Sequence, residues 1–456
     1  MSNMINIGLS GLLASQSALS VTSNNIANAN VAGYSRQQAM LATVSGGAYG
    51  NGVAVTGVRR IADQYLVDQV WSNASNSEFH AVQKSYFGQV EQIFGSEGSD
   101  ISAGLDQLYA ALNANLLAPD DIATRQSALN EAEGLALRFN AVNDGVQSQF
   151  DQIESQLGAS VVEANVHLGQ IARLNSEVKS HGGVETAPPE LLDERDNVIA
   201  ELSKLMDVSV SENKDGTLNV ALSQGQPLVV GSTAAELSLA PDPANPEFGL
   251  LSLSFGDNQF SLDEGIEGSM GSLLDYRDNS LKDSKAFIDE LAQQIADEMN
   301  TVLMAGTDLD GNPPTQDLFS YDPVNPAGTL KVTDGFTADK LAFAKDGTPG
   351  DNSNLKDLID LANKPLTFVS LGLESTMGDA FASKMGQLGS SSQQAKLNAD
   401  SSEQSLIRAQ SDWAGVSGVN TDEEGANLIL YQQAYQSNAK VISTADQLFQ
   451  TVLQAF

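Results

Sequence analysis

The two ends of the chain carry helical patterns of apolar residues on segments that are almost free of charge. At the N-terminus the apolar positions fit alternating steps of four and three, which predicts an amphipathic helix with a coiled-coil seam. The predicted seam residues are Ile5, Leu9, Leu12, Leu19 and Ile26. The first charged residue is Arg36. Because desolvating an unpaired charge is costly, the small uncharged residues on the other face indicate a helix that other subunits enclose.

The C-terminus shows the same combination of features. Thr421 and Glu424 have the spacing of a capping box, and the run Asp422-Glu423-Glu424 suits the positive end of a helix dipole. After Glu424 the only charged residues are Lys440 and Asp446. The predicted seam residues of this helix are Leu428, Tyr431, Tyr435, Ile442, Ala445, Phe449, Val452 and Phe456.

We expect the two terminal helices to pair as a coiled coil. Neither helix has an apolar face wide enough to be stable alone in water, so we expect both to be loosely ordered in the free monomer and to fold on assembly. The alternative is that both are ordinary terminal helices packed on one domain.

The middle of the chain alternates between helical and strand-like patterns. A very long helix is predicted from about Pro119 to the stop at His181-Gly182-Gly183. Shorter helices are predicted over 79–94, 191–205, 272–303 and 377–413. Alternating apolar residues around the turn Asp215-Gly216 predict strands within 207–268, and a loop-rich β segment is expected over 307–350.

We therefore predict a mostly α fold with inserted β domains, of the α+β class. The predicted parts are a terminal coiled-coil domain (1–60 with 415–456), a helical middle domain built as a long-helix bundle (61–206 with 269–306 and 351–414), an inserted β domain (207–268), and a loop-rich β segment (307–350) packed on the middle or the β domain. Each inner domain is inserted into the sequence of an outer one. This order suits a radial subunit whose termini lie at the axis of a polymer.

The charge balance limits the partners of the chain. The 456 residues include 58 acidic and 23 basic residues, which gives a net charge of −35. Such a chain repels phosphate and anionic membrane surfaces, so we expect no nucleic-acid or membrane partner. No continuous apolar segment of membrane-spanning length and no basic region typical of a cleaved leader is expected at the N-terminus.

No group of residues predicts catalysis, and we expect no enzyme activity, no metal and no cofactor. The chain has no cysteine, and His80, His167 and His181 are far apart in sequence. Asp308-Leu309-Asp310-Gly311-Asn312 departs from the calcium-loop template and is interpreted as a turn. The glycine-rich segment 46–52 lacks the lysine of a phosphate-binding loop and is interpreted as a connector.

Two motifs resemble those of the bacterial flagellar axial proteins, the family of rod, hook and hook-associated subunits. The first is the asparagine-rich run from Ser23 to Arg36, with Val31 where the family usually has Thr. The second runs from Ser417 to Gln436 and is most similar to the hook-associated junction subunits, as is the segment Leu191–Asp196. The signature residues of this resemblance are Asn24, Asn25, Ile26, Ala27, Asn28, Gly33, Tyr34, Asp422, Glu423 and Glu424.

The resemblance implies a structural role at the junction between hook and filament. The expected partners are copies of the chain itself in a ring or short helical stack, the hook protein, the second hook–filament junction protein, and an export chaperone that covers the C-terminal helix. It further implies an extracellular location reached by type III export without a cleaved leader. The alternatives are another axial subunit of the distal rod or hook, and an enzyme hidden in a β insertion, which no group of residues supports.

Overall fold

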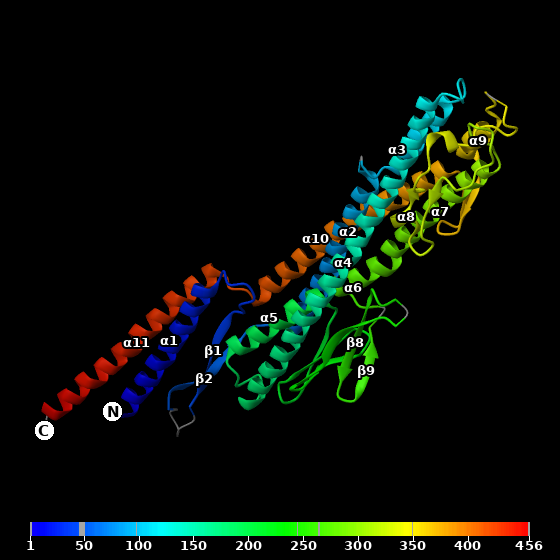
Figure 1. Cartoon of the computed structure of the whole chain (residues 1–456). Coiled ribbons are helices and arrows are strands. Elements are labelled where there is room, and N and C mark those ends of the chain that lie inside the picture. Colours follow the sequence, from blue (N-terminus) through cyan, green and yellow to red (C-terminus); the bar gives the residue numbers. More distant parts are fainter. Residues whose placement is uncertain are drawn as a thin grey trace. The chain divides into compact units, whose positions relative to one another are not determined.

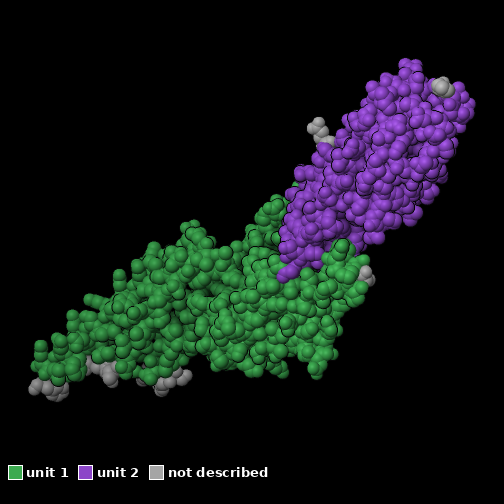
Figure 2. Space-filling model, in the orientation of Figure 1, with its two compact units in different colours: residues 1–79, 159–271, 400–456 green, residues 80–158, 272–399 purple. Residues whose placement is uncertain are grey.

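A computed structural model describes residues 2–44, 51–96, 98–243, 245–262, 265–348 and 350–454. The chain forms two compact units, the first from 1–79, 159–271 and 400–456 and the second from 80–158 and 272–399 (Figure 2). Helices predominate and the sheets are small and antiparallel, which confirms the α+β class. The four domains expected from the sequence divide the chain differently, and their bounds stay a prediction.

The terminal helices of the first unit lie side by side and run in opposite directions (Figure 1). They are α1 (Ser2–Asn28) and α11 (Thr421–Gln454). Whether this pairing has coiled-coil geometry in an assembly stays a prediction. By length and composition alone α1 is apolar enough to cross a membrane, with a mean hydropathy of 1.3 over its best window within Asn3–Asn28. The sequence-based expectation concerned a continuous apolar run, which α1 does not contain; its small residues keep the mean hydropathy high between the larger apolar side chains.

A hairpin follows α1 and packs against it. Strand β1 (Gln37–Thr43) pairs with β2 (Val53–Arg60), with a register shift between Met40 and Leu41. The Ser10 hydroxyl accepts a hydrogen bond of 3.2 Å from the Val53 N–H. The sequence pattern did not predict these strands, and residues 46–50 of the glycine-rich connector lie outside the described residues. A two-stranded hairpin is marginal alone, so its packing on α1 supplies the support it needs.

The predicted long helix is α4 (Ile122–Ser180), whose 59 residues contribute to both units. At 1.5 Å per residue it is about 90 Å long. The apolar positions of one continuous face, including Phe139, Val146 and Ile153, are fully buried. The helix ends as expected, since Gly182 and Gly183 adopt φ of 91° and 108° and the Gly183 N–H donates to the Val178 carbonyl. Helix α5 (Pro189–Leu205) follows.

The β region of the first unit holds two antiparallel sheets. The strands of the first sheet, in spatial order, are β3 (Ser209–Glu212), β4 (Leu218–Ala221), β5 (Pro227–Val230) and β6 (Thr233–Ala234). Those of the second sheet are β7 (Glu236–Pro241), β8 (Gly249–Phe255) and β9 (Asn258–Ser261). The predicted turn joins β3 to β4 with Gly216 at φ 80°. The carbonyl of Gly216 accepts a hydrogen bond of 2.8 Å from the buried Arg195 of α5, which fixes the hairpin to the helix.

The second unit contains long helices and several short elements. Its long helices come from α2 (Gln64–Gly95), α4, α7 (Lys282–Met304) and α10 (Met377–Ser417), joined by α3 (Ile101–Ala114) and α6 (Gly268–Asp275). The short elements are β10 (Phe319–Ser320), α8 (Pro326–Thr329), β11 (Lys331–Val332), a 3-10 turn (Ala338–Lys340), α9 (Ser353–Asp360), a second 3-10 turn (Leu361–Asn363), β12 (Leu366–Phe368) and β13 (Leu373–Ser375). Residues 307–348 are loop-rich, as expected.

Two features of the second unit differ from the helices predicted by pattern. The helix expected over 79–94 begins already at Gln64, and its first turns carry the buried apolar residues Val67, Trp71 and Ala74 at helical spacing, a signal that the prediction missed. The helix expected over 272–303 is interrupted by a π-helical segment, Tyr276–Leu281. There the Lys282 N–H donates to the Arg277 carbonyl, five residues earlier, and a repeat of 3.6 residues cannot reveal such an insertion.

Candidate functional site

The signature residues meet where the terminal helices join the rest of the first unit. We call this region the terminal joint and define it as residues 25–37, 60, 190–197 and 417–424. It contains the end of α1, the turn into β1, the end of β2, the first turns of α5 and the link between α10 and α11. Segments from four parts of the chain converge there.

Asn25 holds the end of α1 to the start of β1. Its side chain is buried, donates to the Gln37 carbonyl at 2.9 Å, and accepts from the Gln37 N–H and the Tyr34 hydroxyl at 2.9 Å each. Every hydrogen bond therefore crosses the turn. Asn24 is exposed, and the Asn28 side chain donates to the Asn24 carbonyl at 3.0 Å, as expected of asparagine near a helix end. Ile26 and Ala27 are exposed.

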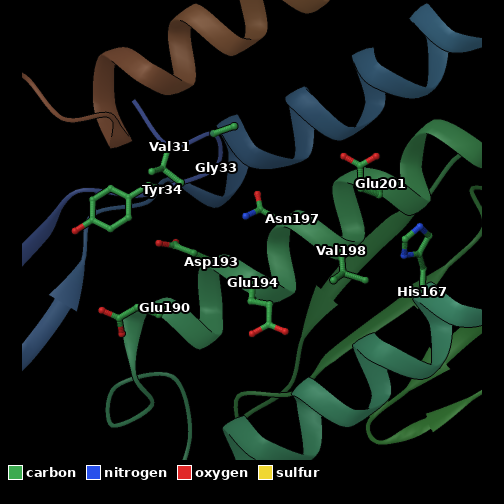
Figure 3. Close-up of a pocket in the computed structure, with 11 residues that line it drawn as sticks. Val31, Gly33, Tyr34, His167, Glu190, Asp193, Glu194, Asn197, Val198 and Glu201 are labelled. Atoms are coloured by element: carbon green, nitrogen blue, oxygen red, sulfur yellow. The ribbon is translucent and has the colours of Figure 1, made fainter. Parts of the chain in front are cut away.

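Gly33 lets the turn pass close to α5. Its φ of 73° lies in the left-handed region, and a Cβ there would overlap the side chain of Asn197. Figure 3 shows Asn197 beside Gly33, with Tyr34 next to it. Burial, reinforced by the charges of Glu190, Asp193 and Glu424, raises the pKa of Tyr34 to about 12. The Tyr34 hydroxyl thus stays protonated and can donate to Asn25.

A buried ion-pair network anchors the turn to α5. Asp193 accepts from the Ser35 N–H at 3.1 Å and pairs with Arg60 at 3.1 Å, and Arg60 also pairs with Asp196. Burial raises the pKa of Asp193 although Ser35 and Arg60 act to lower it. Burial also acts to lower the pKa of Arg60, but Asp196 and Asp193 outweigh it and the pKa of Arg60 is raised. Both partners are hydrogen-bonded, so the buried charges are compensated.

The start of α11 is tied to the same turn. The Arg36 N–H donates to the Ser417 carbonyl at 2.7 Å, and its guanidinium pairs with Glu423 at 2.8 Å. The Asn420 side chain accepts from the N–H groups of Asp422 and Glu423, at 3.0 and 3.3 Å. Asn420 is therefore the N-cap, and the predicted capping box at Thr421 was placed one residue too late.

The remaining acidic residues of the signature have two environments. Asp422 and Glu423 are exposed in the first turn of α11, as predicted from the helix dipole. Glu424 is only 3% exposed.

Within one chain, α1 meets α11 through small residues. Gly8 lies against Ile442 and Val441, and Gly11 lies against Asn438. The large seam residues Leu9 and Ile26 of α1 are 46% and 37% exposed, whereas Ile5, Leu12 and Leu19 are half-buried. On α11, Leu428, Tyr431 and Ile442 are half-buried and Ala445 is buried, while Tyr435, Phe449 and Val452 are exposed. Phe456 lies outside the described residues.

The role of these large residues as a seam in an assembled polymer stays a prediction. Inside the chain the closest approach occurs where glycine removes the side chain, a device that apolar periodicity does not reveal.

A pocket of about 360 Å³ opens between the turn and α5. Val31 and Val198 line it, and His167 reaches its edge from α4 (Figure 3). His167 lies 3.7 Å from Glu163 and is half-buried rather than fully solvated as expected. No group of three or more metal-ligating side chains occurs among the described residues. The Asp308 loop is a turn, because the Asp308 carboxylate accepts from the N–H groups of Asp310 and Asn312.

Comparisons with known proteins cover the whole chain. The profile of the flagellar hook-associated protein FlgK helical domain matches residues 87–319. The profiles of the flagellar basal body rod FlgEFG protein C-terminal region and the flagella basal body rod protein match residues 415–455 and 5–34. Thus both terminal helices belong to segments that rod-type proteins share.

Full-length relatives agree with these profiles. Flagellar hook-associated protein 1 of Salmonella typhimurium is 29% identical over an alignment of 557 residues, which covers 99% of this chain and 100% of that protein. Those of Escherichia coli and Bacillus subtilis are 27% and 26% identical, over 99% and 97% of this chain and 100% and 96% of theirs. Because the first alignment is longer than 456 residues, that relative has segments that this chain lacks.

A solved structure supports the fold. The flagellar hook junction protein FlgK from Burkholderia pseudomallei superimposes with a TM-score of 0.69 at 16% identity, covering 77% of this chain and 100% of that chain.

Proposed function

Because this chain belongs to the family of the flagellar hook-associated protein FlgK, we propose that it is a structural subunit of the bacterial flagellum at the junction between hook and filament. The observation that carries this function is the similarity to hook-associated protein 1 across 99% of the chain, which includes both terminal helices and the helical units between them. The function is structural, and no catalytic role is proposed.

The terminal helices are the part of the subunit proposed to enter the axial structure. The terminal joint would transmit force from this helix pair to the rest of the first unit, since hydrogen bonds and ion pairs connect the turn to α5 and α11. In the assembled junction we propose that the pair takes part in a coiled coil. The middle and β domains, with the bounds given above, would lie outside it.

The proposed partners are other copies of the chain, the hook protein on one side and the second hook–filament junction protein on the other. An export chaperone is the fourth proposed partner. Its binding surface would be the C-terminal helix, where Tyr435, Phe449 and Val452 are exposed. Export without a cleaved leader through the flagellar type III apparatus is proposed with this role.

Deleting the gene tests the function. We expect normal hooks, no attached filaments and monomeric flagellin in the medium, with motility restored by the intact gene. Loss of the hooks themselves would instead identify a rod or hook subunit, the alternative function. Filaments of normal number and length in the deletion strain would contradict both.

A further inference from the structure

We propose that a groove between the terminal helices and the hairpin receives the C-terminal end of α11 from a second copy of this chain. The proposal rests on the proposed function, which requires neighbouring copies to pack together. It adds which surfaces of two copies meet.

The terminal groove lies in the first unit and has a volume of about 500 Å³. Its floor is the small-residue face of α1, its two walls are the hairpin and the middle of α11, and none of its lining residues is charged. The residues that matter most are Gly11, Ala14, Ala18, Leu41, Val53 and Leu430. Ile7 is the one large side chain that α1 contributes to the lining, and the other α1 residues there are Gly11, Ala14, Ser15 and Ala18. Apolar side chains of another helix can therefore pack between the two walls over this small-residue part of the floor.

The chain exposes an apolar ridge that suits this groove. Gly8 faces Ile442 and Gly11 faces Asn438, so the antiparallel register of α1 and α11 runs out near Leu448. Helix α11 continues to Gln454, beyond the first residue of α1. The C-terminal ridge consists of Leu448, Phe449, Val452 and Leu453, which are 47%, 47%, 41% and 61% exposed.

Helix α11 cannot place its own C-terminal ridge in the terminal groove of the same chain. The groove is lined by α11 residues between Leu430 and Asn438, and the ridge begins ten residues later on the same unbroken helix. Ten helical residues span about 15 Å, so the ridge is held away from the groove that its own helix helps to form. The occupant must come from another molecule.

The charge distribution selects a second copy as that molecule. With a net charge of −35, two copies repel one another over most of their surfaces. The groove is uncharged, and the only charged residue after Lys440 is Asp446. Contact between groove and ridge thus brings together two parts of the chain that carry almost no charge, and it buries the exposed apolar side chains of the ridge.

Cysteine cross-linking tests the proposal directly, because the natural chain has no cysteine. Two versions of the chain would be expressed together in a host that lacks the chromosomal gene, one carrying only Leu41→Cys and the other only Phe449→Cys. Hook–filament assemblies would be isolated, oxidised and separated on a non-reducing gel. A disulfide between the two variants can form only between different molecules.

We expect a covalent dimer at least tenfold more abundant than with the control pair Thr56→Cys and Phe449→Cys. Thr56 is exposed on the same hairpin but does not line the groove. A second pair, Val53→Cys with Val452→Cys, should behave like the first and guards against a defect at one position. If both test pairs give no more covalent dimer than the control pair, although the variants are incorporated normally, the proposed contact between groove and ridge is wrong. Absence of the unmodified chain from the junction would instead overturn the proposed function.

Discussion

Asn25 near the end of α1 and Gly33 in the turn after it show how single residues fix the direction of the chain. Gly33 is needed because the backbone is left-handed and lies against Asn197. Asn25 is needed because one amide satisfies three groups across the turn. The sequence marked both as signature residues through resemblance. Their physical roles depend on Asn197 and Gln37, neither of which carries a recognisable pattern.

Gly33→Ala should lower the free energy of unfolding by about 1–3 kcal/mol, through strain at positive φ and the overlap with Asn197. Urea denaturation followed by circular dichroism measures this change. The matched control is Gly169→Ala in α4, where nothing lies near the new methyl group and the change should be neutral or stabilising by up to about 1 kcal/mol. Equal effects of the two changes would refute the role assigned to Gly33.

Asp278 should make stability depend on pH. Burial acts to raise its pKa, but hydrogen bonds from Arg277 and Lys282 outweigh it and hold the pKa of Asp278 below its ordinary 3.8. The ionised carboxylate therefore stabilises the fold above pH 3.8, and this contribution is lost as the pH falls through the lowered pKa.

Asp278→Asn should cost about 1–2 kcal/mol at pH 7, allowing for partial exposure, and much less at pH 3. Urea midpoints at both values measure the difference from the natural chain. Asp106→Asn, at an exposed position in α3, is the control. If the Asp278→Asn deficit is the same at both pH values, this assignment fails.

At the scale of the elements, the π-helical segment Tyr276–Leu281 places a polar network among the packed helices of the second unit. The Tyr276 hydroxyl donates to Gln149 at 2.9 Å, and the buried Arg277 pairs with Glu154 at 2.8 Å. One extra residue in the helix turns both side chains toward these partners. Apolar periodicity identified the helix on either side but contained no sign of the insertion.

Deleting Asn279 should restore a regular α-helix and separate the two halves of the network. We expect unchanged helix content by circular dichroism but a loss of about 3 kcal/mol of unfolding free energy, because the buried Arg277 loses its pair with Glu154 and Tyr276 loses its bond to Gln149. Asn279→Ala keeps the length and should stay within about 0.5 kcal/mol of the natural chain. If the variant that lacks Asn279 is as stable as Asn279→Ala, the π-helical segment has no structural role.

At the scale of the whole molecule, the two ends of the sequence carry few charged residues, whereas the segments between them are strongly acidic. Glu424 and Ala445 are the only fully buried residues among those described in helix α11. Most of the surface of this helix is therefore available for contacts with other subunits. This distribution is the physical basis for assigning assembly to the terminal helices.

Ile442→Asp should block incorporation into the junction while leaving the second unit folded. The charge would face Gly8 of α1 in an uncharged contact. Immunoblots of isolated hook–filament assemblies should show at least a tenfold loss, and the thermal unfolding of the second unit should not change. Gln447→Asp, at an exposed position on the same helix, is the control. Normal filament attachment in the Ile442→Asp strain would contradict the prediction.

Brief proteolysis of dilute monomer should remove both terminal helices and leave a core that contains α4. Helix α11 has only Glu424 and Ala445 buried, and α1 buries mainly small side chains, whereas α4 has a continuous buried face of large ones. Mass spectrometry of the fragments identifies the cleavage sites, and the assembled protein should resist the same treatment. Resistance of both ends in the free monomer would show that they are already ordered.

The sequence by itself determined the long helix, the strands around Asp215-Gly216 and the low charge of the two ends. These depend on local periodicity, turn residues and charge, which a linear pattern contains. Only the tertiary structure decided that Arg60 pairs with Asp193, that Asn420 caps α11, and that α1 meets α11 through Gly8 and Gly11. The ion pair and the helix contact join residues more than a hundred positions apart, and a small residue at a close approach leaves no apolar signal along the chain. The Asn420 cap is local, but Thr421 with Glu424 also has the spacing of a cap, so the pattern alone did not choose between them.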